Sequence, residues 1–272
     1  MSKKVKVIVI RTAGTNCDEE TAFAFKAQGA DTDLVHINRL LEGKTKLDSY
    51  HILAIPGGFT YGDDIESGRI LANELRLYLI KSINKFIKDG KLIIGICNGF
   101  QVLVKSGFLP GLSNKKINSF KDLPQDVTLI SNDSSKFEDR WTYLKTDGKS
   151  IWTEGLGETV YYPVAHAEGK FVVKSKKVLE ELKKNKQIIF RYCNFSGNKP
   201  VYPENPNGSI DNIAGISDKT GRILGLMPHP ERHFSFTQHP FWTRLERKSD
   251  FGDGALIFKN GVNYAKKNLI KG

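Results

Sequence analysis

The sequence predicts an α/β fold in which a mostly parallel central sheet is flanked by helices. Before Gly111, short apolar runs of strand length alternate with segments of helical periodicity, and this alternation is typical of parallel sheets whose strands are joined by helices. The runs are apolar throughout, as strands must be when helices cover both faces of a sheet. After Gly111 the candidate strands are shorter and more polar, which predicts a mixed or antiparallel extension of the sheet.

The first elements follow the order strand, loop, helix. Residues 5–10 form a β-rich apolar run, and the helix formers of residues 18–28 end at Gly29, a residue type that often closes helices. Apolar residues at helical spacing predict one long helix over residues 69–88. Further short strands are expected at residues 32–36, 51–55 and 91–96.

The second part of the chain completes the expected sheet. Candidate strands lie at residues 126–130, 141–145, 170–173 and 187–192. Two more strands, at residues 213–217 and 222–226, lead into Pro228-His229-Pro230-Glu231, and residues 254–267 have the pattern of a closing helix. The sequence contains no internal repeat and no clear interdomain linker, so residues 4–268 are expected to form a single domain.

Composition narrows the possible classes of function. The net charge of +11 comes from 41 Lys and Arg against 30 Asp and Glu, but the lysines form no basic stripe interleaved with aromatic residues, so nucleic-acid binding is not expected. No stretch approaches the roughly 18 consecutive apolar residues of a membrane span, and the N-terminus lacks the apolar core of an export signal. The 3 cysteines lack metal-type pairing, which favours free thiols and a cytoplasmic setting.

Cys97 lies at a predicted turn between a strand and a helix, within the pattern Gly-x-Cys-x-Gly. This pattern is the cysteine version of a nucleophile elbow, a sharp turn in which the neighbouring residues must be small. Gly95 and Gly99 provide that space, and the nearby helix N-terminus favours negative charge on the sulfur. We therefore predict that Cys97 is a nucleophile, with a buried core cysteine as the alternative. Cys17 and Cys193 have no such surroundings and are interpreted as buried cysteines.

A candidate oxyanion site follows another strand. A predicted buried strand ends in Pro56-Gly57-Gly58, a turn that allows the backbone to approach a ligand closely. In a parallel sheet this strand ends at the same edge as the strand before Cys97, and such edges bind ligands. The backbone amides of Gly58 and Asn98 are therefore candidate oxyanion donors, with a plain tight turn as the alternative.

A candidate base lies at the end of a later strand. A thiol that attacks an amide needs a base, and the base needs an orienting carboxylate. Pro228-His229-Pro230-Glu231 supplies both, because its two prolines fix the backbone around His229 and the spacing lets Glu231 reach the imidazole. A surface turn that holds both residues by chance is the alternative. Among the other histidines, His166 comes closest to this setting, with Glu168 nearby.

Three segments carry a resemblance to a known family. Gly-Ile-Cys-Asn-Gly-Phe-Gln, Pro-Gly-Gly-Phe and Pro-His-Pro-Glu, each at the end of a predicted strand, resemble those of the class I glutamine amidotransferases. The resemblance implies a flavodoxin-like α/β fold and hydrolysis of glutamine to glutamate and ammonia. It also implies roles for six residues: thioester-forming nucleophile Cys97, proton carrier His229, orienting carboxylate Glu231, oxyanion donors Gly58 and Asn98, and glutamine-holding Gln101.

Longer motifs resemble one subfamily, the glutaminase subunits of phosphoribosylformylglycinamidine synthase. These motifs are residues 56–64, 137–141, 166–169, 205–209, 213–216 and 225–232. The resemblance extends over about residues 4–268. It implies that ammonia passes to a separate synthase subunit, which uses ATP and Mg to aminate formylglycinamide ribonucleotide, and that a small accessory subunit joins the complex. No cofactor is expected in this chain, whose sequence has no P-loop pattern.

Several alternatives remain open. The chain could serve another synthase, or it could be a non-catalytic or redox protein of the cysteine-elbow α/β type. His166 and Glu168, with residues 205–209, are interpreted as loops at the partner interface or along the ammonia path, with simple turn structure as the alternative. Residues 176–204 and 239–254 look additional to the shortest members of the subfamily, and their pattern indicates no role.

Overall fold

The computed structural model describes residues 3–63, 65–112 and 124–270 of the 272-residue chain. Asp64, which belongs to the motif at residues 56–64, lies outside these ranges. In the described part, nine strands form one sheet in the order β2-β1-β3-β4-β11-β10-β9-β6-β7, and β5 and β8 form a separate antiparallel pair. The strands are β1 Lys6–Arg11, β2 Asp31–His36, β3 Ile52–Ile55, β4 Leu92–Ile96, β5 Val127–Ile130, β6 Glu138–Thr146, β7 Thr159–His166, β8 Lys170–Val173, β9 Ile188–Cys193, β10 Ile213–Ser217 and β11 Ile223–Leu226.

The large sheet has a parallel half and an antiparallel half, which confirms the predicted fold class. β1 pairs in parallel with β2 and β3, and β4 pairs in parallel with β3 and β11. From β11 onward, through β10, β9 and β6 to β7, each pair is antiparallel. β3 and β4 are buried along their whole length, as strands covered on both faces require. Because parallel strands end at one edge, the residues that follow β3, β4 and β11 meet there.

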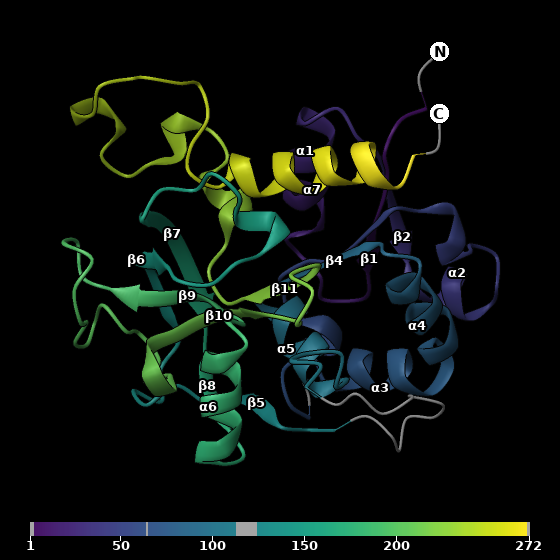
Figure 1. Cartoon of the computed structure of the whole chain (residues 1–272), viewed down its shortest axis with the longest axis horizontal. Coiled ribbons are helices and arrows are strands. Elements are labelled where there is room, and N and C mark those ends of the chain that lie inside the picture. Colours follow the sequence, from purple (N-terminus) through teal and green to yellow (C-terminus); the bar gives the residue numbers. More distant parts are fainter. Residues whose placement is uncertain (1–2, 64, 113–123, 271–272) are drawn as a thin grey trace.

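Helices cover both faces of the sheet (Figure 1). They are α1 Asp18–Ala27, α2 Ile37–Leu41, α3 Arg69–Tyr78, α4 Ile80–Lys88, α5 Asn98–Lys105, α6 Lys176–Lys184 and α7 Ala255–Asn268. α1 and α7 lie together on one face, where the rings of Phe25 and Phe258 meet edge to face at 5.0 Å between centroids, a favourable aromatic geometry. α3 and α5 pack together on the opposite face. None of the helices within the described ranges has the length and apolarity that crossing a membrane requires.

The prediction of one long helix over residues 69–88 is wrong. Leu79, with φ −108° and ψ 2°, separates α3 from α4. Leu75 and Ile83, on either side of the break, are both buried, so the change of direction lets each helix turn its own apolar side inward. No glycine or proline marks the break, which is therefore set by tertiary packing rather than by local propensity.

The strand β7 and the helices α2 and α6 have no counterpart in the prediction. β7 contains Pro163, and a proline inside an apolar run argues against a central strand. The strand tolerates it because β7 lies at the edge of the sheet and pairs only with β6, where Pro163 is opposite Trp141. α6 begins after Ser175, whose side chain accepts a hydrogen bond from Val178 N–H, a common start for a helix. Part of the additional stretch 176–204 is thus regular helix.

Candidate active site

Cys97 lies in a sharp turn between β4 and α5. Its φ of 51° and ψ of −106° are values that residues other than glycine rarely adopt. Cys97 N–H donates a hydrogen bond of 2.8 Å to the carbonyl oxygen of Leu226 in β11, which fixes the turn to the sheet. A Cβ at Gly99 would overlap the carbonyl oxygen of Ile55, and one at Gly95 would overlap that of Gly99. The two glycines therefore have the steric role that the elbow pattern predicts.

His229 and Glu231 follow β11 and reach the same edge as Cys97, because β11 is parallel to β4. The 3₁₀ turn Pro230–His233 brings Glu231 Oε1 to 2.6 Å from His229 Nδ1. Their exposed fractions are 1% for His229 and 2% for Glu231, so water does not compete for this hydrogen bond. His229 Nε2 has no hydrogen-bond partner among the described residues. It is the nitrogen left to exchange a proton with a nucleophile.

The surroundings of His229 favour its protonated form. Burial by itself would lower the pKa of His229, but the Glu231 carboxylate and then the Cys97 sulfur outweigh it and hold the pKa of His229 well above its ordinary value. His229 can therefore keep the proton that a thiol gives up and later pass it to a leaving group. This is the chemistry needed to break an amide bond with a cysteine nucleophile.

The loop after β3 is shaped by the residues that follow β1. Gly58 has a φ of 134°, a backbone conformation open mainly to glycine. Phe59 N–H donates to Gly14 O over 2.9 Å, and Cys17 N–H donates to Gly57 O over 3.3 Å. The backbone after β1 thus fixes one side of the loop that follows β3, which we call the glycine loop.

The backbone amides of Gly58 and Asn98, the predicted oxyanion donors, are both without a backbone acceptor among the described residues. Asn98 is the first residue of α5, and the first amides of a helix have no acceptor within it. Between them, a Cβ at Gly57 would lie 2.7 Å from His229 Cε1 and 3.4 Å from Cys97 Cβ. The glycine loop, the imidazole and the cysteine therefore converge on one point.

A comparison with known proteins identifies the family. A profile of the CobB/CobQ-like glutamine amidotransferase domain matches residues 4–265. The chain belongs to this family.

The amidotransferase is similar to curated proteins over nearly its whole length. It is 48% identical over 266 residues to the phosphoribosylformylglycinamidine synthase subunit PurQ of Dehalococcoides mccartyi, and the match covers 97% of this chain and 99% of the relative. The PurQ subunit of Archaeoglobus fulgidus is 44% identical over 276 residues, with 97% and 98% covered. A chain in the structure of PurLQS from Thermotoga maritima matches with a TM-score of 0.71 at 29% identity, covering 96% of this chain and 99% of that chain.

Gln101 of the amidotransferase belongs to a buried network beside the elbow. Its Nε2 donates to Glu168 O over 2.6 Å, and its Oε1 accepts from Asn98 Nδ2 over 2.9 Å. Asn98 Oδ1 in turn accepts from the hydroxyl of Thr60 over 2.7 Å, which ties the elbow to the glycine loop. A contact between Gln101 and glutamine stays a prediction. The structure adds that Gln101 fixes the backbone at Glu168.

His166 is a neutral histidine next to the amidotransferase site. Asn207 Oδ1 accepts from the amide and hydroxyl of Ser209 at 3.1 and 2.7 Å, so Asn207 presents its NH₂ group to His166 Nε2 at 3.4 Å. The proton of His166 therefore resides on Nδ1, a buried atom without a partner in the described ranges. Burial, and then the charge of His229, lower the pKa of His166 to about 3.

Cys17 is a neighbour of the site that the sequence does not reveal. Its flanking residues give no sign of catalysis, and it is buried as interpreted, yet its Sγ lies 3.9 Å from His229 Nδ1. Its position in the chain is the one feature that could have indicated this. Cys17 follows β1, a parallel strand that ends at the same edge of the sheet as β3. Cys193, in β9, is likewise a free buried cysteine.

One group of side chains in the described part of the amidotransferase could hold a metal ion. Its ligand atoms lie within 4.8 Å of one another and come from Cys17, Glu20, His229 and Glu231. Sulfur, nitrogen and carboxylate donors suit zinc. However, Arg232 Nη2 already donates to Cys17 Sγ at 3.1 Å, and Arg232 Nε donates to Glu20 Oε1 at 2.7 Å. A guanidinium therefore already supplies positive charge to two of the four donors.

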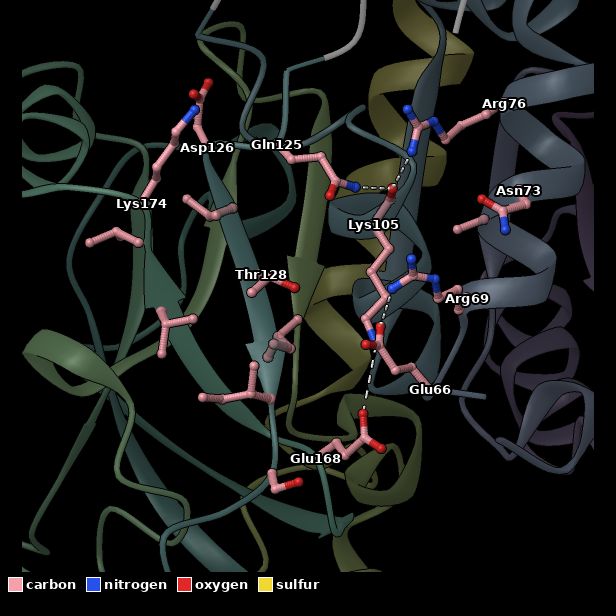
Figure 2. Close-up of a pocket in the computed structure, with 17 residues that line it drawn as sticks. Glu66, Arg69, Asn73, Arg76, Lys105, Gln125, Asp126, Thr128, Glu168 and Lys174 are labelled. Carbon is pink, nitrogen blue, oxygen red and sulfur yellow. Dashed lines mark hydrogen bonds and ion pairs between the residues drawn. The ribbon is translucent and has the colours of Figure 1, made fainter. Parts of the chain in front are cut away.

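A cavity of about 590 Å³ lies at the far end of α5 from the elbow (Figure 2). Neither Cys97 nor His229 lines it, so this cavity is separate from the predicted catalytic residues. Lys105, the last residue of α5, pairs there with Glu168 at 3.6 Å between Nζ and Oε2. Polar side chains of α3 also line it: Arg69, Asn73 and Arg76. Glu168 thus connects this cavity, through its carboxylate, to the network beside the elbow.

Proposed function

We propose that this chain is the glutaminase subunit of phosphoribosylformylglycinamidine synthase, with Cys97, His229 and Glu231 as its catalytic triad and residues 4–268 acting as one domain. The similarity to PurQ subunits over nearly the whole chain supports the choice of synthase. One observation carries the proposed chemistry. The strained turn at Cys97 and the buried His229–Glu231 pair meet at the shared edge of two parallel strands.

In the first step, the Cys97 sulfur attacks the carbonyl carbon of the glutamine side-chain amide, and the thiol proton passes to His229. The electrons of the C=O double bond move to oxygen, and the amides of Gly58 and Asn98 stabilise the resulting oxyanion. Glu231 accepts the Nδ1–H of His229 over 2.6 Å and so stabilises the imidazolium and fixes its orientation.

In the second step, His229 returns the proton to the amide nitrogen. The C–N bond breaks, ammonia leaves, and Cys97 carries a γ-glutamyl thioester. Water then adds to the thioester with His229 as base, and collapse of the second tetrahedral species releases glutamate and restores the thiol. In this proposal Gln101, which is hydrogen-bonded to Asn98 and to the carbonyl oxygen of Glu168, helps to hold the glutamine.

The ammonia is consumed by the synthase subunit, which uses ATP and Mg to convert formylglycinamide ribonucleotide to formylglycinamidine ribonucleotide in purine biosynthesis. A small accessory subunit completes the complex. The three free buried cysteines support a cytoplasmic location, where thiols stay reduced.

Glutamate release by wild type and by Cys97→Ala tests the assignment, each with and without the cognate synthase subunit, formylglycinamide ribonucleotide and Mg-ATP. We expect release that depends on Cys97 and rises in the complete mixture. An ammonium salt supplied to the Cys97→Ala mixture should restore synthesis of formylglycinamidine ribonucleotide, which shows that the synthase in that mixture is active and that only the supply of ammonia is lost.

Three outcomes contradict the proposal in different ways. If wild type and Cys97→Ala release glutamate at the same rate, the proposed triad is wrong. Cys97-dependent release that never couples to this synthase points to another synthase. The absence of both release and a γ-glutamyl adduct on Cys97 points to a non-catalytic elbow protein.

A further inference from the structure

The sulfur of Cys17 touches the proposed triad without belonging to it. It lies 3.9 Å from His229 Nδ1, on the side of the imidazole that faces Glu231. A Cβ at Gly57 would lie 3.1 Å from this sulfur and 2.7 Å from His229 Cε1. Since Gly57 has no side chain, the thiol and the imidazole can lie in contact above it.

Cys17 is fixed from several directions and is not a second nucleophile. Its thiol donates to Asn16 Oδ1 at 3.2 Å, and its carbonyl oxygen accepts from the hydroxyl of Thr21 at 2.6 Å. Burial, the largest influence, raises the pKa of Cys17 to about 11. The group beside His229 is therefore a neutral thiol at physiological pH.

Arg232 holds this sulfur from the other side. Its Nη2 donates to Cys17 Sγ at 3.1 Å, while its Nε donates to Glu20 Oε1 of α1 at 2.7 Å. Arg232 directly follows Glu231 in the chain, so the guanidinium connects the turn that carries Glu231 to α1. Sulfur is a weak hydrogen-bond acceptor, and it leaves the Nδ1–H of His229 to the carboxylate.

We propose that Cys17 and Arg232 form a clamp that positions His229 and Glu231 toward Cys97. Both are positioning residues, since they contact the triad rather than the reacting atoms. The inference rests on the proposed triad. Cys17 supports the Nδ1 edge of the imidazole, and Arg232 fixes the turn that carries Glu231. A cysteine that only filled space would contribute to folding and leave the pH dependence of the reaction unchanged.

The first test compares Cys17→Ala, Cys17→Ser and the matched control Cys193→Ala in the complete synthase complex. We expect Cys17→Ala to lower kcat roughly ten- to a hundredfold with little change in KM for glutamine. The alkaline limb of kcat should move to lower pH, because an imidazole displaced from Glu231 loses part of the charge interaction that raises the pKa of His229. Cys17→Ser should recover part of kcat, since its hydroxyl can accept from Arg232, and Cys193→Ala should match wild type. Wild-type kcat and an unshifted limb in Cys17→Ala overturn the clamp.

The second test asks whether the two residues act together. Arg232→Met keeps a long side chain at a position whose side chain is 34% exposed, so the fold should tolerate it. For a clamp, the double variant Cys17→Ala/Arg232→Met is no slower than the slower single variant. If the loss of kcat in the double variant equals the product of the losses in the two single variants, the two residues act independently and the proposal is overturned.

A third measurement separates this inference from the proposed function. The rate of alkylation of Cys97 by iodoacetamide at neutral pH, followed by mass spectrometry, requires no glutamine. We expect slower alkylation in Cys17→Ala and in Arg232→Met, because a displaced imidazole assists the thiol less. Equal rates in wild type and both variants overturn the clamp and leave the proposed function standing, whereas glutamate release indifferent to Cys97→Ala overturns the proposed triad, on which the clamp rests.

Discussion

Gly57 is the position where a single added methyl group probes the site most directly. An alanine Cβ there would lie 2.7 Å from His229 Cε1 and 3.1 Å from Cys17 Sγ, whereas non-bonded carbon atoms settle at about 3.5–4.0 Å. The imidazole must therefore move by roughly 0.8 Å or more. A misplacement of about 1 Å near a reacting group can cost about 10²-fold in rate, equal to about 2.7 kcal/mol of activation free energy. The backbone of Gly57 is not left-handed, so alanine adds no strain of that kind.

The assay is glutamate release by the complete synthase complex, measured together with thermal unfolding. Gly157→Ala is the matched control, because the nearest atom to its Cβ is Thr159 O at 3.5 Å. We expect Gly57→Ala to lose about 10²-fold in kcat and to unfold near the wild-type temperature, and Gly157→Ala to resemble wild type. A wild-type kcat in Gly57→Ala would refute the convergence of His229 and Cys17 above this glycine. If Gly57→Ala loses activity and also unfolds at a much lower temperature than wild type, the loss does not come from a local displacement of His229.

Three further perturbations test other parts of the structure. Glu231→Gln keeps an acceptor beside His229 but removes the charge that raises the pKa of His229. We therefore expect kcat to fall roughly 10³- to 10⁴-fold and the alkaline limb of the pH–rate profile to move to lower pH. A limb that does not move contradicts this. Gly99→Ala would overlap the carbonyl oxygen of Ile55 and should lower the free energy of unfolding by about 3 kcal/mol, as urea denaturation can check against wild type. His166 has a folded-state pKa of about 3 against an ordinary 6.5, so the unfolded chain binds the extra proton in this window and stability falls as pH drops. Wild type should lose up to about 1.4 kcal/mol per pH unit more than His166→Gln, and equal slopes in urea denaturation at pH 4, 5 and 6 would show that His166 is not buried as described.

The parallel half of the sheet and the meeting of Cys97 with His229 could be predicted because both follow from local signals. Strands that are apolar on both faces, such as β3 and β4, indicate a parallel sheet. Residue types that carry chemistry, placed directly after such strands, must share one edge. Both inferences follow from the order of residues along the chain and need no knowledge of distances between side chains. The roles of all six predicted site residues, the three of the triad included, stay predictions until variants are measured.

The remaining features depend on contacts between residues that are far apart in the chain. The break at Leu79 has no glycine or proline to announce it, and it follows from how α3 and α4 pack. Pro163 is acceptable in β7 only because that strand has a single neighbour. Cys17 meets His229 only after the loop that follows β1 has paired with the glycine loop. No local pattern contains this information.

Because β11 lies in the middle of the sheet, the sheet is completed in the same step that brings His229 to Cys97. β11 pairs with β4 on one side and β10 on the other, so the edge of β4 stays open until residues 223–226 have been made. A ribosome that adds roughly 5–20 residues per second needs several seconds to travel from Cys97 to His229. During that time the nascent chain carries the proposed nucleophile without its proposed base, together with an unpaired strand edge that can pair wrongly. The insertion of β11 beside β4 pairs this edge and, in the same step, brings the proposed base His229 to Cys97.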